Sequence, residues 1–264
     1  MQIFIGILLG ILVSLGAWRL GSLSRSGAWA AAITGSLIFG LGGLPWAALL
    51  LTFFISSSAL SKAFKKRKIA VSEKFSKGSQ RDWGQVLANG GLGALLVIAF
   101  AFFPDQPVIW FAYAGAMATV NADTWATELG VLNPRQPRLI TNGQSVEPGT
   151  SGGISLYGTL ATIGGAALIG LAGVAFSPAG EKFSLILAAT LGGTCGSLFD
   201  SLLGATVQAI YHCPQCDKET ERHPTHTCGT ATIQIRGWGW LNNDLVNLGA
   251  SIVGALVAIG ISIL

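Results

Sequence analysis

The sequence predicts an all-α, polytopic membrane protein: a bundle of about eight transmembrane helices forming a single integral membrane domain, residues 1–264. The chain is 51% hydrophobic and only 11% charged, with a mean hydropathy of +0.59, whereas soluble domains carry about 25% charged residues. Apolar runs long enough to cross about 30 Å of hydrocarbon recur along its whole length. Its 36 glycines favour close packing between helices in a bilayer.

The apolar runs predict transmembrane spans at residues 2–18, 27–43, 45–64, 83–103, 107–132, 153–176, 183–206 and 240–264. The first run is followed, not preceded, by basic residues, Arg19 and Arg25, which is the reverse of a secretory signal. It is therefore predicted to be an uncleaved span. Only a few residues separate the second and third runs, so seven or nine spans are the alternatives to eight.

Positive charges predict the orientation, because short cytosolic loops are enriched in lysine and arginine. If the spans alternate, the first, third, fifth and seventh connections share one side. All 16 basic residues except Lys182 lie in those connections or at their edges. We therefore expect a multi-pass protein with these connections in the cytosol and both termini on the opposite side. The pI of about 9.0 then reflects lipid headgroups and cytosolic phosphates, and no nucleic acid partner is expected.

Four carboxylates fall inside predicted spans, although a charge at that depth is energetically costly. Asp123 and Glu128 lie in the fifth span, Asp200 in the seventh and Asp244 at the start of the eighth. All four are expected near the cytosolic end, where no lysine or arginine lies deep in a span. Buried charges must be paired, metal-bound or protonated. The acids therefore predict either a Mg²⁺ site, built from the oxygen ligands this ion prefers, or a proton or ion pathway.

Helical spacing divides the polar residues of the fifth span between two faces. Asn121, Thr124 and Glu128 share one stripe, while Asp123 and Thr127 lie nearly opposite. A regular helix cannot aim both carboxylates at one point. Either this span is unwound, or it stands in the centre of the bundle with polar neighbours on two sides.

Small and amide residues complete this polar layer. In the fourth span, Asn89–Gly91 predicts a helix break whose freed backbone groups line a cavity, with simple glycine packing as the alternative. In the seventh span, a stripe of small residues lies beside Asp200 and would let a ligand or another backbone come near: Gly193, Gly196, Ser197 and Gly204. Amide side chains are expected at the same level: Asn89, Asn121, Asn242, Asn243 and Asn247.

Two of the predicted cytosolic connections offer phosphate-binding groups. The connection from Lys62 to Arg81 carries eight basic residues and is predicted to lie on anionic headgroups, with Arg81 placed to touch phosphate. The connection after the fifth span carries Arg135 and Arg138, and then a glycine-rich segment that leads into a helix start, an arrangement that favours an anion. Within that segment we expect Thr150, Ser151 and Gly152 to bind substrate or nucleotide. It is not a Walker A loop, because the Gly-Lys-Ser/Thr ending is missing.

The connection between the seventh and eighth spans, residues 207–239, contains a Cys/His pattern. Cys213 and Cys216 are followed by His226 and Cys228, a spacing that predicts a small tetrahedral Zn²⁺ site with a structural role. His223 is the competing fourth ligand and His212 a weaker one. A redox Cys-x-x-Cys pair is the alternative reading, although no thioredoxin-like pattern surrounds it.

Several motifs, in order, resemble one known membrane-protein family. They are VLANGG in the fourth span, VNADTWATELG (120–130), GTSGGIS at the sixth span, GSLFDSLLGATVQ (196–208) and RGWGWLNNDLVN (236–247). The chain resembles the family that contains the plant and cyanobacterial phytyl-phosphate kinase, from the second span to the eighth. The resemblance implies transfer of a γ-phosphoryl group from a nucleoside triphosphate, with CTP the suspected donor, to an isoprenoid monophosphate used in tocopherol and related quinone synthesis.

Carried over by position, the resemblance implies active-site roles for Asn89, Asp123, Glu128, Asp200, Asn243 and Asp244. Asp123, Asp200 and Glu128 are the predicted Mg²⁺ ligands, and Asn121 and Asn247 are expected to contact substrate. Two other functions remain open: a cation- or proton-coupled secondary transporter, and a cytidylyltransferase that forms a CDP-lipid. No internal repeat of the kind common in transporters is evident.

Overall fold

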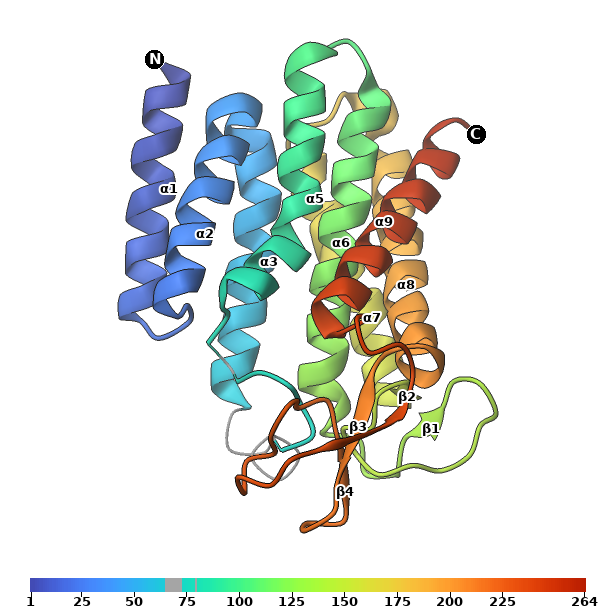
Figure 1. Ribbon diagram of the computed structural model, residues 1–264. Coiled ribbons are helices and arrows are strands. Elements are labelled where there is room, and N and C mark those ends of the chain that lie inside the picture. The colour runs from blue at the N-terminus through green and yellow to red at the C-terminus, as the bar shows by residue number, and fades with distance from the viewer. Residues whose placement is uncertain (65–72, 79) are drawn as a thin grey trace.

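The computed structural model describes residues 1–64, 73–78 and 80–264 (Figure 1). Its helical elements are α1 (Gln2–Arg19), α2 (Arg25–Leu37), the π-helical η1 (Ile38–Gly42), α3 (Gly43–Ala63), α5 (Trp83–Phe102), α6 (Pro107–Gly130), α7 (Leu156–Val174), the 3-10 helix η3 (Ala179–Glu181), α8 (Lys182–Thr206) and α9 (Asn243–Ser262). The strands are β1 (Arg138–Leu139), β2 (Gly153–Ile154), β3 (Ile210–Cys213), β4 (Lys218–Thr220) and β5 (Ile233–Arg236). Part of the predicted basic segment, residues 65–72 and 79, lies outside the described residues.

The fold is a helical membrane bundle, as predicted. In the described part of the chain, six segments are long and apolar enough to cross a membrane. One of them, Arg25–Ala63, contains both α2 and α3. The chain reverses direction between these two helices near Gly43, where φ is 71° (Figure 1). The more polar α6 is not among the six, yet it runs through the bundle beside them. The eight long helices α1, α2, α3 and α5 to α9 correspond to the eight predicted spans.

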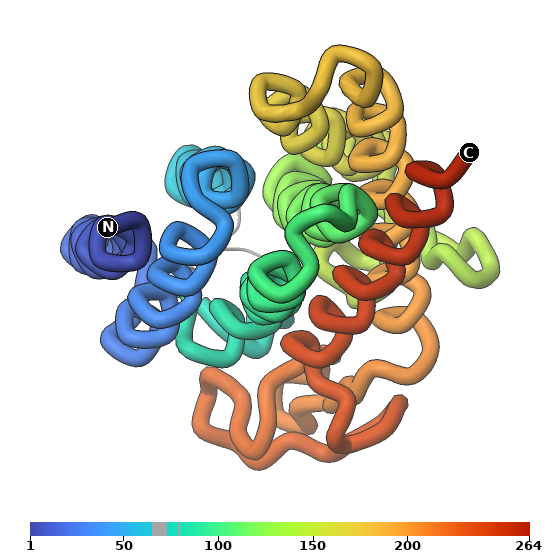
Figure 2. The backbone as a smooth tube through the Cα atoms, turned by 90° about the horizontal axis from the view of Figure 1, so that it is seen from above, coloured from blue at the N-terminus to red at the C-terminus, as the bar shows by residue number. Residues whose placement is uncertain are grey.

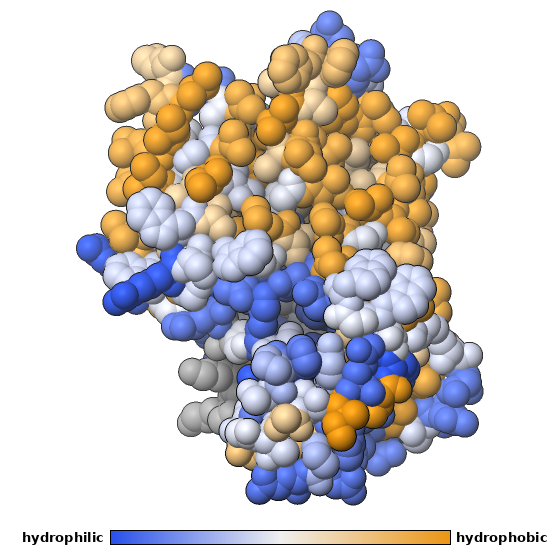
Figure 3. Space-filling model, in the orientation of Figure 1, coloured by the Kyte–Doolittle hydropathy of each residue, from blue (hydrophilic) through white to orange (hydrophobic). Residues whose placement is uncertain are grey.

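The two ends of the bundle differ in their connections. The segments 131–155 and 207–242, which carry all the described strands, extend from one end, which we call the loop end. The turns at 103–106 and 175–181 and both termini lie at the other end (Figure 1). Apolar side chains cover the helices, and hydrophilic side chains gather at the loop end (Figure 3). This relative arrangement is the one that alternation of the spans predicts.

Helix starts at the loop end are fixed by side chains. Ser24, Asp82, Ser155 and Asn242 each accept a hydrogen bond from a backbone N–H three residues on, at the starts of α2, α5, α7 and α9. At α5, Gln85 returns a bond to the Asp82 amide and completes a capping box. The four helices that begin at the opposite end, α1, α3, α6 and α8, have no such side-chain cap. The backbone is therefore specified most tightly next to the polar loops.

Glycines let the inner helices approach one another, as the sequence predicted. A Cβ placed on Gly192 of α8 would lie 2.6 Å from the carbonyl oxygen of Gly254 in α9, and one on Gly115 of α6 would lie 2.5 Å from the same atom. Backbones this close exclude any larger side chain at these positions. As a result α6, α8 and α9 form a tight three-helix contact.

The centre of the bundle is α6 (Figure 2). Residues 111–122 of this helix are buried on every side, and α6 is a continuous helix from Pro107 to Gly130. Two alternatives were open for the fifth span, an unwound helix or a helix in the centre of the bundle. The structure shows the second. The predicted break at Asn89–Gly91 was wrong: α5 is continuous there, and Gly90 is buried against Thr34 of α2, so packing supplies the reason for that glycine.

Candidate functional site

A cavity of about 1170 Å³, including its open mouth, lies at the loop end among α6, α7 and α8. We call it the polar cavity. Of the predicted site residues, these line it: Asp123, Arg135, Thr150, Ser151, Gly152, Asp200 and Asn243. The finger segment 207–242 closes one side through Gln208 and Glu221. Segments distant in the sequence thus converge on one space large enough for a small-molecule ligand.

Asp123 and Asp200 enter the polar cavity from two helices that pack closely. The small-residue stripe of α8 makes this approach possible, since a Cβ on Gly193 would lie 2.8 Å from that of Ala118 in α6. Asp200 is near enough to Asp123 and Glu221 to interact electrostatically with both. Its Oδ2 atom is buried and has no hydrogen-bond partner among the described residues. A buried, unsatisfied carboxylate oxygen beside other carboxylates is a site that a cation would satisfy.

The opposite face of α6 makes structural contacts. Asn121 is fully buried; its Oδ1 accepts hydrogen bonds from Ser56 and Ser57 of α3 at 2.9 and 3.1 Å. Its amide donates to the carbonyl oxygen of Gly165 in α7 at 2.7 Å. Asn121 therefore joins three helices and does not line the polar cavity, contrary to its predicted contact with substrate.

The glycine-rich segment forms the loop-end wall of the cavity. Gly149 and Gly152 adopt positive φ, 80° and 83°, and a Cβ on Gly152 would lie 2.5 Å from that of Ala205 in α8. The segment thus lies directly on α8 before Ser155 caps α7. Arg135 lines the same space, whereas Arg138 donates to the carbonyl oxygen of Gly143 at 2.9 Å and lies outside the lining.

Lys74 adds a cation that sequence reasoning did not select. Its Nζ donates to Glu147 at 2.7 Å and lies 3.4 Å from the hydroxyl of Thr150. The hydrogen bond from Lys74 lowers the pKa of the Glu147 carboxyl. A lysine therefore stands behind the glycine-rich segment, next to the cavity that Thr150 lines.

Glu221 is the second residue that sequence reasoning missed. From the finger, its Oε1 accepts hydrogen bonds from Ser151 at 2.8 Å and from Gln208 at 2.9 Å, and its Oε2 accepts one from the amide of Ser76 at 3.2 Å. In the sequence, Glu221 is one of several acidic residues in a predicted loop, and no pattern distinguishes it from Asp217 or Glu219. One carboxylate thus binds three segments together at the cavity, and Glu221 is also a third carboxylate near Asp200.

Glu128 lies outside the polar cavity. Its Oε1 accepts a hydrogen bond from Ser61 of α3 at 2.7 Å, and it interacts electrostatically with Arg81. The helical spacing correctly separated Glu128 from Asp123. The structure does not bring Glu128 together with Asp123 and Asp200, its predicted partners in a Mg²⁺ site, because α6 presents the carboxylates of Glu128 and Asp123 to different neighbours.

Asp244 is also separate, and the expectation that it lacks a basic partner was wrong. Lys77, in the connection before α5, forms an ion pair with Asp244 and a second one with Asp82 at 2.9 Å. Although partial burial opposes it, hydrogen bonds with these carboxylates raise the pKa of Lys77. A flexible loop lysine thus reaches a helix start that is far away in the sequence.

The predicted amide groups divide in the same way. Asn243 lines the polar cavity beside α8. Asn89 lines a different, apolar cavity on α5, and Asn247 lines neither. Of these three amides, which were predicted to bind substrate or nucleotide, only Asn243 lies at the polar cavity.

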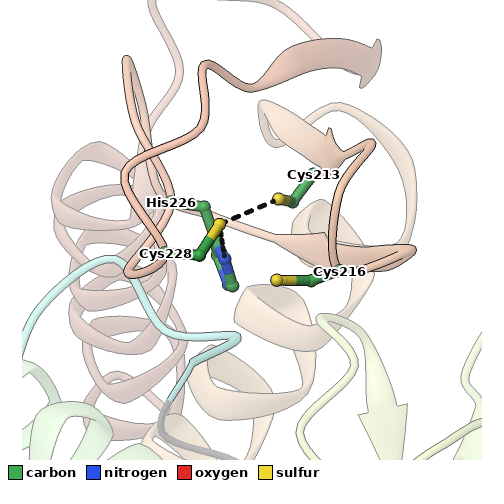
Figure 4. Close-up of side chains that lie close together, drawn as sticks. All are labelled: Cys213, Cys216, His226 and Cys228. Atoms are coloured by element: carbon green, nitrogen blue, oxygen red, sulfur yellow. Dashed lines mark hydrogen bonds between the residues drawn. The ribbon is translucent and has the colours of Figure 1, made fainter.

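The finger contains a cluster that could hold a metal ion (Figure 4). The ligand atoms of Cys213, Cys216, His226 and Cys228 all lie within 4.8 Å of one another. Cys228 Sγ is 3.6 Å from Cys213 Sγ and 3.4 Å from His226 Nδ1. Cys213 is on β3 and Cys216 is in the turn before β4, so the hairpin presents both sulfurs to the later segment. Three sulfurs and one imidazole are the ligand set of a structural zinc site.

The choice of histidine is decided by what the other two contact. His223 stacks on Tyr211, with ring centroids 4.6 Å apart, and His212 pairs with Asp217 at 3.0 Å. Hydrogen bonds from Thr230 and His226 lower the pKa of the Cys228 thiol to about 6. Cys228 is therefore thiolate at neutral pH, which is the form that binds metals.

Comparison with known proteins now gives the family. The model of the family described as integral membrane protein DUF92 matches residues 8–255. The chain belongs to this family. A lipid bilayer therefore surrounds the helices, and the family resemblance found in the sequence is confirmed. No solved structure matches the chain.

Members of the DUF92 family from plants and archaea resemble this chain over most of its length. Protein PGR of Arabidopsis thaliana is 33% identical over 268 residues, covering 93% of this chain and 91% of the relative. An uncharacterized membrane protein of Methanocaldococcus jannaschii is 32% identical over 258 residues, covering 98% and 93%. Protein VTE6, chloroplastic, of Arabidopsis thaliana is 24% identical over 241 residues, covering 90% of this chain and 64% of the relative.

Proposed function

We propose that this protein is a membrane-embedded kinase that transfers the γ-phosphoryl group of a nucleoside triphosphate, CTP being the expected donor, to an isoprenoid monophosphate such as phytyl phosphate. One observation carries the proposal: Asp123 and Asp200 line a cavity at the loop end whose wall is a glycine-rich segment. The resemblance to the family containing phytyl-phosphate kinase supports the same chemistry.

The residues of the polar cavity fit Mg²⁺. The buried Asp200 Oδ2 has no partner among the described residues, and Asp123 and Glu221 are close enough to interact with Asp200. Asp123 and Asp200 would hold the ion, with Glu221 nearby. When bound, Mg²⁺ would neutralise charge on the nucleotide phosphates, the main electrostatic requirement of phosphoryl transfer.

The opposite wall supplies groups for the nucleotide phosphates. In the segment Gly149–Gly153, the amides of Thr150 and Gly153 already donate to backbone carbonyls, so the other amides of the segment and the N-terminus of α7 would favour an anion. Arg135 adds a guanidinium that can bind phosphate with two parallel hydrogen bonds. Lys74 adds charge behind the segment. These groups would position the triphosphate with its charge shared between the carboxylate-held cation and the basic side chains.

The acceptor would approach from among the helices. Ala126 of α6, Leu198 of α8 and Ile154 of β2 line the cavity and give an isoprenoid chain apolar contacts. The acceptor phosphate is already ionised at neutral pH, so no side chain is required to remove a proton from it. The role of the protein is then positioning and charge stabilisation.

The orientation and the finger complete the proposal. The loop end, with its basic residues, would face the cytosol, where nucleotides are found. Cys213, Cys216, His226 and Cys228 would hold Zn²⁺, and four protein ligands leave no open position for catalysis. The zinc would therefore keep the finger folded and Glu221 in place.

The test is an activity assay with purified protein, Mg²⁺, each nucleotide in turn, and phytyl, geranylgeranyl or farnesyl monophosphate. We expect formation of the isoprenoid diphosphate and nucleoside diphosphate, lost in Asp123→Asn and Asp200→Asn. Asp105→Asn, an exposed acid in the turn at the opposite end, is the matched control and should remain active.

The products separate the three functions. A cytidylyltransferase would release pyrophosphate, and a transporter would turn over neither substrate. Full activity in folded Asp123→Asn and Asp200→Asn variants would remove the assignment of the polar cavity as the active site.

A further inference from the structure

A second cavity, of about 650 Å³, lies among α1, α2, α3 and α5. We call it the apolar cavity. Its walls are almost entirely apolar, with Val13, Leu50, Leu51 and Phe54 among the lining residues. This volume includes the open mouth of the cavity. No residue lines both this cavity and the polar cavity.

One cation, Arg81, lines the apolar cavity at the loop end. The backbone of Arg81 is bridged to Leu23 in the α1–α2 connection, which fixes its position between the outer and inner helices. Its guanidinium lies over the rings of Phe53 and Phe54, 5.3 and 5.5 Å from their centroids, and Nη1 donates to Ser58 at 2.9 Å. Burial lowers the pKa of Arg81 to about 10, so the side chain remains charged at neutral pH.

The charge of Arg81 is incompletely compensated within the described residues. With the described residues its guanidinium makes this one hydrogen bond and no ion pair, although a guanidinium has five N–H donors. Glu128 interacts electrostatically with Arg81, and its Oε1 accepts a hydrogen bond from Ser61. A cation with spare donors at the end of an apolar cavity is complementary to an amphiphile with an anionic head.

Polarity falls along α5 away from Arg81. Gln85 and then Asn89 line the cavity at successive turns, and each step of four residues is about 6 Å along the helix. The other lining residues of α5 are Val86 and Gly90, and α1 to α3 contribute mostly apolar side chains together with Ser14 and Thr34. A glycerophospholipid has the same order of groups: a phosphate, then ester carbonyls that accept hydrogen bonds from amides, and then a hydrocarbon chain.

We propose that the apolar cavity binds one phospholipid drawn from the bilayer, with its phosphodiester on Arg81, its ester region beside Gln85 and Asn89, and one acyl chain between α1–α2 and α3–α5. A phosphodiester carries one negative charge and matches the one cation among the described lining residues. A phosphate monoester carries close to two. The site would fix the outer pair α1 and α2 to the rest of the bundle, and it is independent of the kinase activity.

The experiment measures bound lipid by native mass spectrometry. Full-length protein is reconstituted in nanodiscs of phosphatidylglycerol and phosphatidylcholine in equal parts, and the phospholipid retained after release is counted. We expect one retained phospholipid in the wild type, and an occupancy at least about tenfold lower in Arg81→Gln, because the charge-assisted hydrogen bonds to the lipid phosphate are lost. Ala31→Trp, which fills the cavity and leaves Arg81 in place, should also lose the lipid.

Two controls make the result decisive. Arg25→Gln removes an exposed arginine from the start of α2 and should retain the lipid. Arg81→Lys keeps the charge and should retain more lipid than Arg81→Gln, which separates loss of charge from misfolding. Equal retention in wild type, Arg81→Gln and Ala31→Trp would overturn the inference. So would displacement of the lipid by geranylgeranyl monophosphate in wild type but not in Arg81→Gln, since the cavity would then be an isoprenoid phosphate site.

Discussion

The polar and apolar cavities are lined by charges of opposite sign: mainly carboxylates in the first and an arginine in the second. The polar cavity brings Asp123, Asp200 and Glu221 near one another, and Asp200 has a buried oxygen without a partner among the described residues. In the apolar cavity the Arg81 guanidinium lies against two phenylalanine rings and makes a single hydrogen bond with the described part of the chain. Each cavity is therefore complementary to a ligand of the opposite sign: a cation with its phosphates in one, and a lipid phosphate in the other.

The difference also lies in how each cavity is built. The polar cavity depends on the finger, the glycine-rich segment and closely packed inner helices. The apolar cavity depends on helices alone, apart from Leu23 and Arg81 at its end. Disturbing the finger should therefore damage the polar cavity and leave the apolar cavity intact.

Removing the finger's metal site should have the largest effect. In Cys213→Ser the chain should lose its bound zinc, because structural zinc contributes about 10 kcal/mol or more to folding of small sites. Segment 207–242 should become sensitive to protease, and kinase activity should be lost while the phospholipid of the apolar cavity stays bound. Elemental analysis measures the bound zinc, limited proteolysis the sensitivity of the segment, the kinase assay the activity, and native mass spectrometry the bound phospholipid. Cys195→Ser, in α8, is the control and should keep its metal; unchanged zinc in Cys213→Ser would refute the ligand set.

Mg²⁺ should stabilise the wild type through the polar cavity. At a concentration about 100 times its dissociation constant, a ligand that binds only the folded state adds about 2.7 kcal/mol. Thermal unfolding of the solubilised protein should therefore shift upward with Mg²⁺ in the wild type, and little in Asp200→Asn. Without divalent ions, Asp200→Asn should be at least as stable as the wild type, because repulsion from Asp123 and Glu221 is relieved. An equal Mg²⁺ shift in both proteins would place the ion elsewhere.

Glu221→Gln should lower the kinase rate by about tenfold, because hydrogen bonds to a charged group are worth about 1.5–3 kcal/mol and three of them meet here. The matched control is Glu219→Gln, two residues earlier on β4, where the side chain is exposed. Steady-state assays with varied nucleotide measure the change. If the two variants behave alike, Glu221 has no special role at the cavity.

Lys77→Met should have the smallest effect, about 1 kcal/mol or less, because the ion pairs of Lys77 are partly exposed. The pKa of Lys77 is raised in the folded protein, so its contribution is complete below the unfolded value of about 10.4 and is lost as the pH rises through the folded value. Unfolding temperatures of wild type and Lys77→Met should differ by a constant amount from neutral pH to about 10 and converge above it. A difference that already shrinks between neutral pH and about 9, where Asp82 and Asp244 are ionised and Lys77 is protonated, would contradict this.

Sequence reasoning succeeded where helical periodicity or fixed spacing carried the information. The stripe of small residues beside Asp200 predicted a close approach of helices, and Gly193 is packed against α7 as expected. The spacing of Cys213, Cys216, His226 and Cys228 predicted a ligand set whose atoms do lie together. Both patterns are local, so they can be read without knowing how distant segments meet.

Prediction from the sequence failed where a side chain from a loop contacts a distant helix or segment. Lys77 and Asp244 are 167 positions apart, and the reach of a loop lysine leaves no periodic signal. Glu221 sits among other charged loop residues, and only the folded finger directs it to Ser151 and Gln208. Asn89–Gly91 looked like a turn, but packing of Gly90 against α2 overrides that local preference.

Glu221 also has an evolutionary consequence. Its carboxylate is shared by Ser76, Ser151 and Gln208, of which Ser76 lies 145 positions away along the chain. The Ser76 contact comes from its backbone amide, which a substitution there would keep. A substitution at Ser151 or Gln208 removes a side-chain donor to Glu221, so natural variation should couple positions 151, 208 and 221. Homologues that replace this acid should also carry altered hydroxyl or amide partners, and a second-site change at Ser151 or Gln208 should rescue a damaged Glu221.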